Sequence, residues 1–160
     1  MTARIAFIDT GVLVEILAVP GLSAEPDAFK RELRERFAAG QKFVLPVATI
    51  IETGNHINQV KGANADRHAA AKRFDDLLRS AIAGRDPFVA RELVWDAALL
   101  TEILAGDSTG STFVEQAAAG HFGTGDLSIL VERDRFVEQS VYSRADVEIW
   151  TNEELLGAYA

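Results

Sequence analysis

The chain has 160 residues, of which 48% are apolar, so it can form one compact domain with a substantial core but hardly two. It contains no cysteine, which excludes disulfides, thiolate metal sites and a cysteine nucleophile, and three scattered histidines disfavour a zinc site. The net charge of −8 disfavours broad binding of nucleic acid through a basic face. Because no targeting stretch or long apolar run is visible, we expect a single cytoplasmic domain over residues 1–160 with no membrane partner.

The first third of the chain alternates short apolar runs with helical patterns. The continuous run from Ile5 to Ile8 is typical of a central strand that is covered on both faces. Pro26 suits the first turn of a helix, and Pro46 ends a second apolar run. The predicted elements are strands at 5–8 and 43–45 and helices at 12–17, 26–40 and 49–60. Their order predicts a βαβ arrangement.

The remainder of the chain predicts one long helix and several shorter elements. In chain order we expect a helix at 65–82, a short or irregular strand at 92–95, helices at 96–105, 112–119 and 126–137, a strand at 147–150 and a terminal helix from Thr151. Asp96 is expected to cap its helix, and Thr151 with Glu154 forms a predicted capping box. A glycine-rich loop over 120–125 leads to Asp126.

Four acidic residues stand where an apolar run or a tight loop gives way to a helical pattern: Asp9, Glu52, Asp126 and Glu153. In an open parallel sheet the carboxyl ends of the strands share one edge, and ligands bind there. Carboxylates gathered at that edge repel one another unless a cation lies between them, and oxygen ligands favour Mg²⁺ or Mn²⁺. The pattern therefore suggests a metal site, and the chemistry it suggests is phosphodiester hydrolysis.

Each of these acids also has a simpler structural interpretation. Asp9 and Asp126 can each favour a helix N-terminus, and Glu52 can form a capping box with Thr49. Glu153 can be a solvated surface acid. None of these local interpretations explains why acids recur after the first strand, after the second, in the glycine loop and after the last strand. Their joint placement favours a shared site.

The acids lie in four stretches, IAFIDTGVLVEIL, PVATIIETGNHI, GTGDLSILVERD and VEIWTNEELLGAY, which fall in order from residue 5 to residue 159. Together these stretches resemble the PIN domain, a family of metal-dependent ribonucleases that includes the toxins of VapBC-type toxin–antitoxin pairs. The resemblance implies an α/β fold, a three-layer α/β/α sandwich around a mostly parallel central sheet. It also implies that Asp9, Glu52 and Asp126 bind Mg²⁺ or Mn²⁺. The family's fourth acid, usually aspartate, corresponds to Glu153, with Asn152 beside it.

The predicted activity is metal-dependent cleavage of single-stranded RNA, with the four acids as the catalytic and metal-binding residues. We expect Thr10, Asn55 and Ser128 to orient water or phosphate, although capping and solvation explain them equally well. Arg133 is a further substrate-binding candidate, which can contact the RNA backbone or simply lie on a solvated helix face. His121, in the loop before Asp126, is the only histidine that merits a test.

The resemblance also implies partners and leaves alternatives open. If the chain is a toxin of this family, the resemblance implies a small antitoxin whose basic side chain can enter the acidic pocket, and family members commonly form homodimers. One alternative is a PIN-like domain that has lost hydrolysis and serves as a protein-interaction module. A phospho-acceptor receiver domain is disfavoured because Asp9 stands alone after the first strand and Trp150-Thr151, without lysine, ends the last one.

Overall fold

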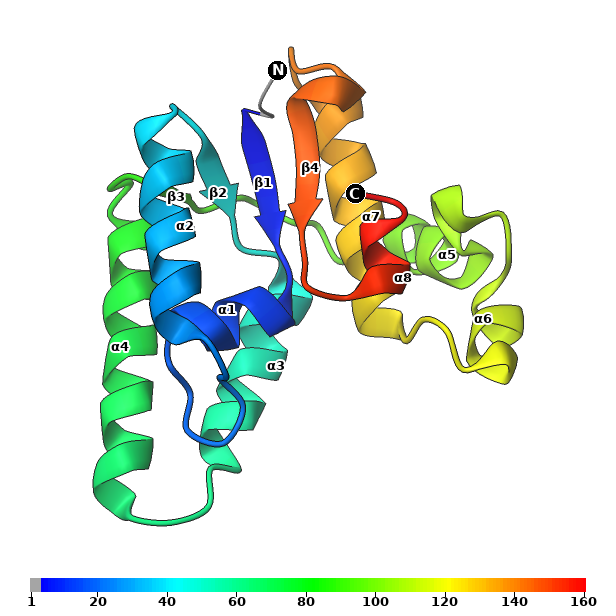
Figure 1. Cartoon of the computed structure of the whole chain (residues 1–160). Helices are drawn as coiled ribbons and strands as arrows, with labels where there is room; N and C mark the ends of the chain where they lie inside the picture. Colours follow the sequence, from blue (N-terminus) through cyan, green and yellow to red (C-terminus); the bar gives the residue numbers. More distant parts are fainter. Residues whose placement is uncertain (1–3) are drawn as a thin grey trace.

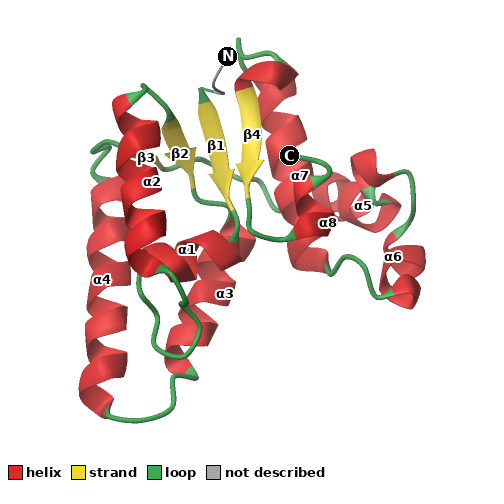
Figure 2. Ribbon diagram, viewed as in Figure 1, coloured by secondary structure: helices red, strands yellow, loops and turns green. Residues whose placement is uncertain are grey.

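The computed structural model describes residues 4–160, which form a four-stranded, all-parallel sheet with helices on both sides (Figure 1 and Figure 2). The strands are β1 (Ile5–Ile8), β2 (Lys42–Val44), β3 (Phe88–Val89) and β4 (Val147–Trp150), in the spatial order β3-β2-β1-β4. β1 is central because it pairs with both β2 and β4, with Ile5 opposite Lys42 on one side and Val147 on the other.

Eight α-helices and two short 3-10 helices complete the described part of the chain. The helices are α1 (Thr10–Ile16), α2 (Pro26–Ala38), α3 (Val47–Asn58), α4 (Asn64–Ile82), α5 (Ala97–Ala105), α6 (Phe113–Ala119), α7 (Thr124–Gln139) and α8 (Glu154–Gly157), with 3-10 turns at Asp107–Thr109 and Arg144–Asp146. Within residues 4–160, no helix combines the length and the apolar character needed to cross a membrane.

Successive residues of β1 point to opposite faces of the sheet and enter two separate cores. Ala6 and Ile8 pack in a cluster that includes α1 and α4, whereas Ile5 and Phe7 pack with apolar residues of α5 and α7. This alternation is what the period of two in a strand dictates when both faces are covered. The predicted α/β sandwich of three layers with a parallel sheet is confirmed.

The strand predicted at residues 92–95 is wrong. The sheet instead takes its edge strand from Phe88–Val89, in register with Phe43 and Val44 of β2. Phe88 is buried, and its ring centroid lies 6.0 Å from that of Phe43, whereas Val94 and Trp95 remain exposed. The strand forms where an aromatic side chain can enter the core.

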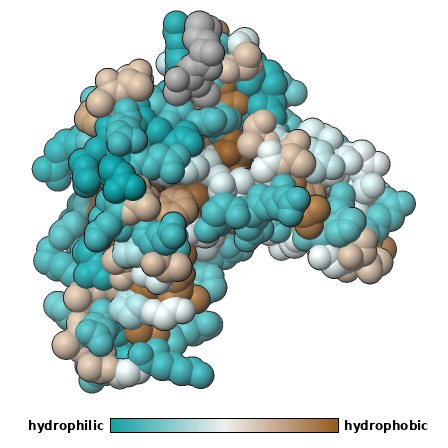
Figure 3. Space-filling view, viewed as in Figure 1, coloured by the Kyte–Doolittle hydropathy of each residue, from teal (hydrophilic) through white to brown (hydrophobic). Residues whose placement is uncertain are grey.

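The parallel arrangement brings the carboxyl ends of the strands to one edge of the sheet. The arrowheads of β1, β2 and β4 all point that way in Figure 1, and α1 follows β1 directly at that edge. The surface there is hollowed: Figure 3 shows a notch between the part of the molecule that contains α3 and α4 and the part that contains α5 and α6. The C-terminal edge is therefore where a ligand site is expected.

Candidate functional site

Asp9 is the first residue after β1, and its carboxylate joins the ends of two strands. The side chain is 3% exposed. Its Oδ1 accepts a hydrogen bond from the backbone N–H of Thr10 at 2.7 Å, so Asp9 does cap α1. Its Oδ2 accepts from the hydroxyl of Thr151, just beyond β4, at 2.8 Å. Because the second bond spans 142 residues of sequence, the carboxylate is more than a local cap.

Glu52 lies in the second turn of α3 and does not form the predicted capping box. Pro46 is the N-cap, so α3 begins before Thr49, which is buried and donates its hydroxyl to the carbonyl of Ile8 at 2.8 Å. The carboxylate of Glu52 is consequently available for another partner. Its Oε2 accepts from the hydroxyl of Thr10, the residue after Asp9, at 2.7 Å.

Asp126 lies in the first turn of α7, beside a glycine whose lack of a side chain makes room for Glu52. Oδ2 of Asp126 accepts from the backbone N–H of Gly123 at 3.0 Å, as a helix N-terminal acid commonly does. A Cβ on Gly125 would lie only 2.2 Å from Oε1 of Glu52. The Glu52 carboxylate therefore rests directly against the backbone of Gly125, and only glycine allows that approach.

Glu153 is the most exposed of the four acids. It precedes α8 as the N-cap residue without a side-chain capping bond, and its backbone N–H donates to the hydroxyl of Thr151 at 2.9 Å. The predicted capping box of Thr151 with Glu154 is thus wrong, because the Thr151 hydroxyl is used by Asp9 and by the Glu153 backbone.

The four acids lie near enough to one another for charge to affect the pKa of three of them. Burial raises the pKa of Asp9 and outweighs the hydrogen bonds from Thr151 and Thr10, and the charges of Asp126 and Glu52 raise it further. Burial also raises the pKa of Asp126, with an added contribution from Glu52. The pKa of Glu153 rises through burial and then through the charges of the other three acids. We call Asp9, Glu52, Asp126 and Glu153 the carboxylate cluster.

The carboxylate cluster has no ion-pair partner among the residues that the structure describes. Across the same residues, no three acidic or imidazole side chains already have the spacing of metal ligands. The carboxylates face hydroxyl and amide donors instead. The cluster offers only oxygen ligands and carries excess negative charge, and Gly125 leaves space beside Glu52. These ligands suit Mg²⁺ or Mn²⁺.

The residues predicted to bind substrate have different surroundings. Thr10 contacts the cluster through its hydrogen bond to Glu52, and Ser128, which is buried, donates its hydroxyl to the carbonyl of Gly125 at 2.7 Å. Asn55 is exposed on α3, one turn after Glu52. The role predicted for Arg133 is wrong. Its side chain is 1% exposed and donates to Asp134 and, at 2.8 Å, to the carbonyl of Tyr159, so it cannot reach RNA.

Two contributors to the site were not anticipated from the sequence. Thr151 holds Asp9 rather than a helix end. A Cβ on Gly11 would lie 2.2 Å from Oδ1 of Asn152, so Gly11 makes room for the residue beside the fourth acid. The sequence does place Thr151 two positions before Glu153, but a threonine there also predicts a helix cap, so it does not by itself indicate a contact with Asp9. His121, the histidine singled out for testing, lines a separate pocket with Phe122 and Tyr159.

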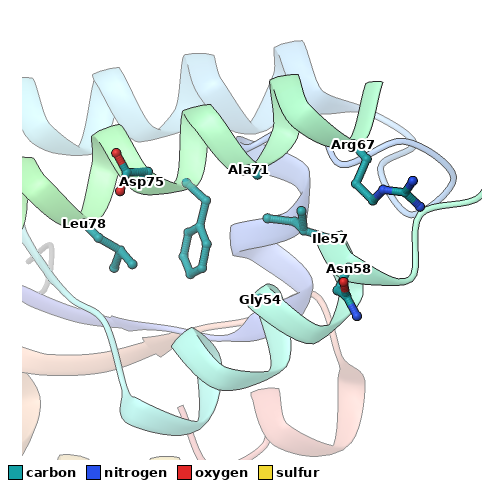
Figure 4. A pocket seen from close by; sticks show the side chains of 8 residues that line it. Gly54, Ile57, Asn58, Arg67, Ala71, Asp75 and Leu78 are labelled. Carbon is teal, nitrogen blue, oxygen red and sulfur yellow. The ribbon is translucent and has the colours of Figure 1, made fainter. Parts of the chain in front are cut away.

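Several pockets border α3, and one of them reaches the carboxylate cluster. A pocket of about 460 Å³ is lined by Glu52, Gly125 and Ser128 together with apolar residues of α3 and α5. A second pocket of about 350 Å³ lies between α3 and α4, with Ile57 between Leu78 and Arg67, which mark its opposite ends (Figure 4). None of the four acids lines this second pocket, so it is separate from the cluster.

Comparisons of the chain with protein-family models, with curated proteins and with solved structures found no match. The membership in the PIN family that the four stretches suggest therefore stays a prediction. What the molecule offers toward a function is the position, burial and charge of its carboxylate cluster.

Proposed function

We propose that this protein is a Mg²⁺- or Mn²⁺-dependent endoribonuclease that hydrolyses phosphodiester bonds of single-stranded RNA. The observation that carries the proposal is the convergence of four acids from four separate segments at the carboxyl edge of a parallel sheet, without a basic partner among residues 4–160. Buried carboxylates without compensation are costly to maintain, and a divalent cation removes that cost.

In this proposal Asp9, Glu52 and Asp126 hold the metal, and Glu153 assists a second ion or a bound water. A divalent ion held by these residues would supply Lewis acidity toward the phosphate and would make a bound water more acidic. It also reverses the local potential, so that a protein with a net charge of −8 can attract RNA at this one place. Dependence on metal should therefore be strict.

The chain's own groups prepare this arrangement by fixing the carboxylates. The Thr10 hydroxyl orients Glu52, and the Thr151 hydroxyl and the Thr10 backbone N–H together orient Asp9. These donors restrict the side-chain rotamers and leave further oxygen lone pairs for a ligand. Burial of Asp9 also limits competition from bulk water. Thr10 and Thr151 are thus positioning residues.

The direct test is cleavage of a labelled single-stranded RNA with Mn²⁺ or Mg²⁺. We expect Asp126→Asn to reduce the rate by more than about a hundredfold, since loss of even an indirect metal contact costs about ten- to a hundredfold. Asp66→Asn is the matched control, because Asp66 also lies in the first turn of a helix but is exposed and lies outside the cluster. Equal cleavage by all three proteins, or cleavage that survives EDTA, contradicts the proposal.

Further parts of the proposal rest on the resemblance to PIN toxins. They are a cytoplasmic location, a homodimer and a small antitoxin whose basic side chain would meet the uncompensated carboxylate cluster. The alternative is a PIN-like interaction module without hydrolysis. A wild-type protein that binds no Mn²⁺ but binds a protein partner tightly would favour this alternative.

A further inference from the structure

The pocket of about 460 Å³ beside Glu52 has a strongly apolar wall that the proposed hydrolysis does not use. It is formed by α3, by the segment that precedes α5, by α5 and by the start of α7, and we call it the Trp95 pocket. Ile51, Trp95 and Leu104 line it and are each more than half exposed, and Leu100 is 49% exposed. Its volume falls in the range of about 300–1,000 Å³ that is typical of ligand pockets.

Part of this apolar wall has a structural role. Asp96 caps α5, so Trp95 and Leu100 occupy the two positions that form a hydrophobic staple around a helix N-terminus. A staple would leave much of the indole ring uncovered, since Trp95 is still 58% exposed. That open aromatic surface is available to a ligand.

The Trp95 pocket is continuous with the carboxylate cluster. Glu52 lines the pocket and also accepts the hydrogen bond from Thr10. Gly125 lines it as well and lies against Glu52, immediately before Asp126. A chain of RNA whose phosphate lies at the cluster would therefore pass the mouth of the pocket.

We propose that the Trp95 pocket binds one unpaired base of the RNA by stacking on Trp95, next to the phosphodiester that is cut. This inference rests on the proposed ribonuclease function. Proteins that recognise single-stranded RNA stack its splayed bases on aromatic side chains, and stacking needs no basic surface. The edge of the base would meet acceptor oxygens, because Glu52, Thr124 and Ser128 lie on the same pocket wall. The amino and imino groups of a base can donate hydrogen bonds to these oxygens.

The size of the Trp95 pocket favours a base over a second copy of this chain. Ten residues line it. A stable protein interface needs about 20 to 30 residues on each side, so the pocket alone falls well short of a dimer interface.

The first test compares RNA cleavage by three variants. Trp95→Ala should raise KM for single-stranded RNA about tenfold, in keeping with the cost of losing one stacked base. Trp95→Phe should keep KM near the wild-type value because it retains an aromatic face. Val94→Ala is the matched control, since Val94 is the exposed neighbour of Trp95 but does not line the pocket. Thermal unfolding of all variants separates loss of the helix staple from loss of binding.

The second test uses no metal and no catalysis. Adenosine is titrated in EDTA while tryptophan fluorescence is followed, with ribose as the control that lacks a base. Only two tryptophans are present, and Trp150 is 5% exposed in the core, so quenching by adenosine reports on Trp95. We expect saturable quenching in the wild type, none in Trp95→Phe, and none with ribose.

The possible failures are distinguishable. Wild-type cleavage of RNA with an unchanged KM in Trp95→Ala and no quenching by adenosine overturns the base pocket and leaves the ribonuclease intact. Quenching by adenosine in a protein that cuts no RNA overturns the proposed function and leaves the base pocket intact. A dimer in sedimentation that Trp95→Ala dissociates, with no response to adenosine, shows that a second copy occupies the pocket and overturns the inference.

Discussion

At the scale of single residues, the site is governed by the cost of holding negative charge away from water. Asp9 is buried, and both of its oxygens accept hydrogen bonds, yet its pKa is still raised. Hydrogen bonds to the charged form therefore recover only part of the desolvation cost. Without metal, the cluster should destabilise the native state whenever its carboxylates are ionised.

This cost predicts that Asp126→Asn stabilises the metal-free protein. The folded pKa of Asp126 lies above the ordinary value of 3.8, so the native state binds the proton more tightly than the unfolded state does. The stability contributed by that proton is lost as pH rises from 3.8 through the folded pKa. In EDTA at pH 7 we therefore expect the variant to melt at a higher temperature than the wild type. A lower melting temperature in calorimetry would show that Asp126 serves chiefly as a helix cap.

Glu132 predicts a second pH effect, independent of the cluster. Its side chain is 6% exposed and accepts a hydrogen bond from the backbone N–H of Val47 at 3.1 Å. Burial raises the pKa of Glu132 to about 7, although the Val47 hydrogen bond and the charge of Arg91 both lower it. Because the folded pKa exceeds the unfolded value of 4.5, wild-type stability should fall between pH 4.5 and about 7.

Glu132→Gln should remove this dependence and stabilise the protein at pH 8 by about 3 kcal/mol at most, since each pH unit between the two pKa values is worth about 1.4 kcal/mol. Urea unfolding across the pH range measures the effect. Glu138→Gln, an exposed change on the same helix, is the control. Parallel pH profiles for wild type and Glu132→Gln would refute the assignment.

At the scale of elements, the site depends on helices that begin at fixed points and on a glycine in one of them. Pro46 starts α3 early, which turns Thr49 into the core and frees Glu52. The capping boxes predicted at Thr49 and Thr151 failed for the same physical reason. A capping motif is a local pattern, whereas each hydroxyl found a better partner from a distant segment, which local sequence does not display.

Gly125→Ala tests the contact between α7 and Glu52. Alanine favours a helix by about 1 kcal/mol over glycine, yet its Cβ would lie 2.2 Å from Oε1 of Glu52 and would displace that carboxylate. We expect Mn²⁺ affinity to fall about tenfold or more, as when the support of a metal ligand is removed, without a matching loss of stability. Gly54→Ala in α3 is the control, since its Cβ would make only an ordinary contact of 3.7 Å with Phe74. Unchanged Mn²⁺ affinity in Gly125→Ala would contradict the described contact.

At the scale of the whole molecule, the layers follow from the alternation of apolar strand patterns with helical patterns along the sequence. The apolar run at Ile5–Ile8 is buried on both faces, as a central parallel strand requires, and Asp9 stands directly where that strand ends. Burial of a particular side chain was not predictable in the same way. Arg133 reads as part of a solvated helix face, but the terminal segment around Tyr159 covers it.

The central claim is that the four acids act together as one divalent-cation site, and calorimetric titration of Mn²⁺ tests it most directly. Wild type should bind Mn²⁺ saturably, and so should Glu154→Gln, which neutralises an exposed acid next to the cluster. Asp9→Asn and Asp126→Asn should each abolish that binding while remaining folded by circular dichroism. Equal Mn²⁺ binding by all four proteins, or no binding by folded wild type, would contradict the account.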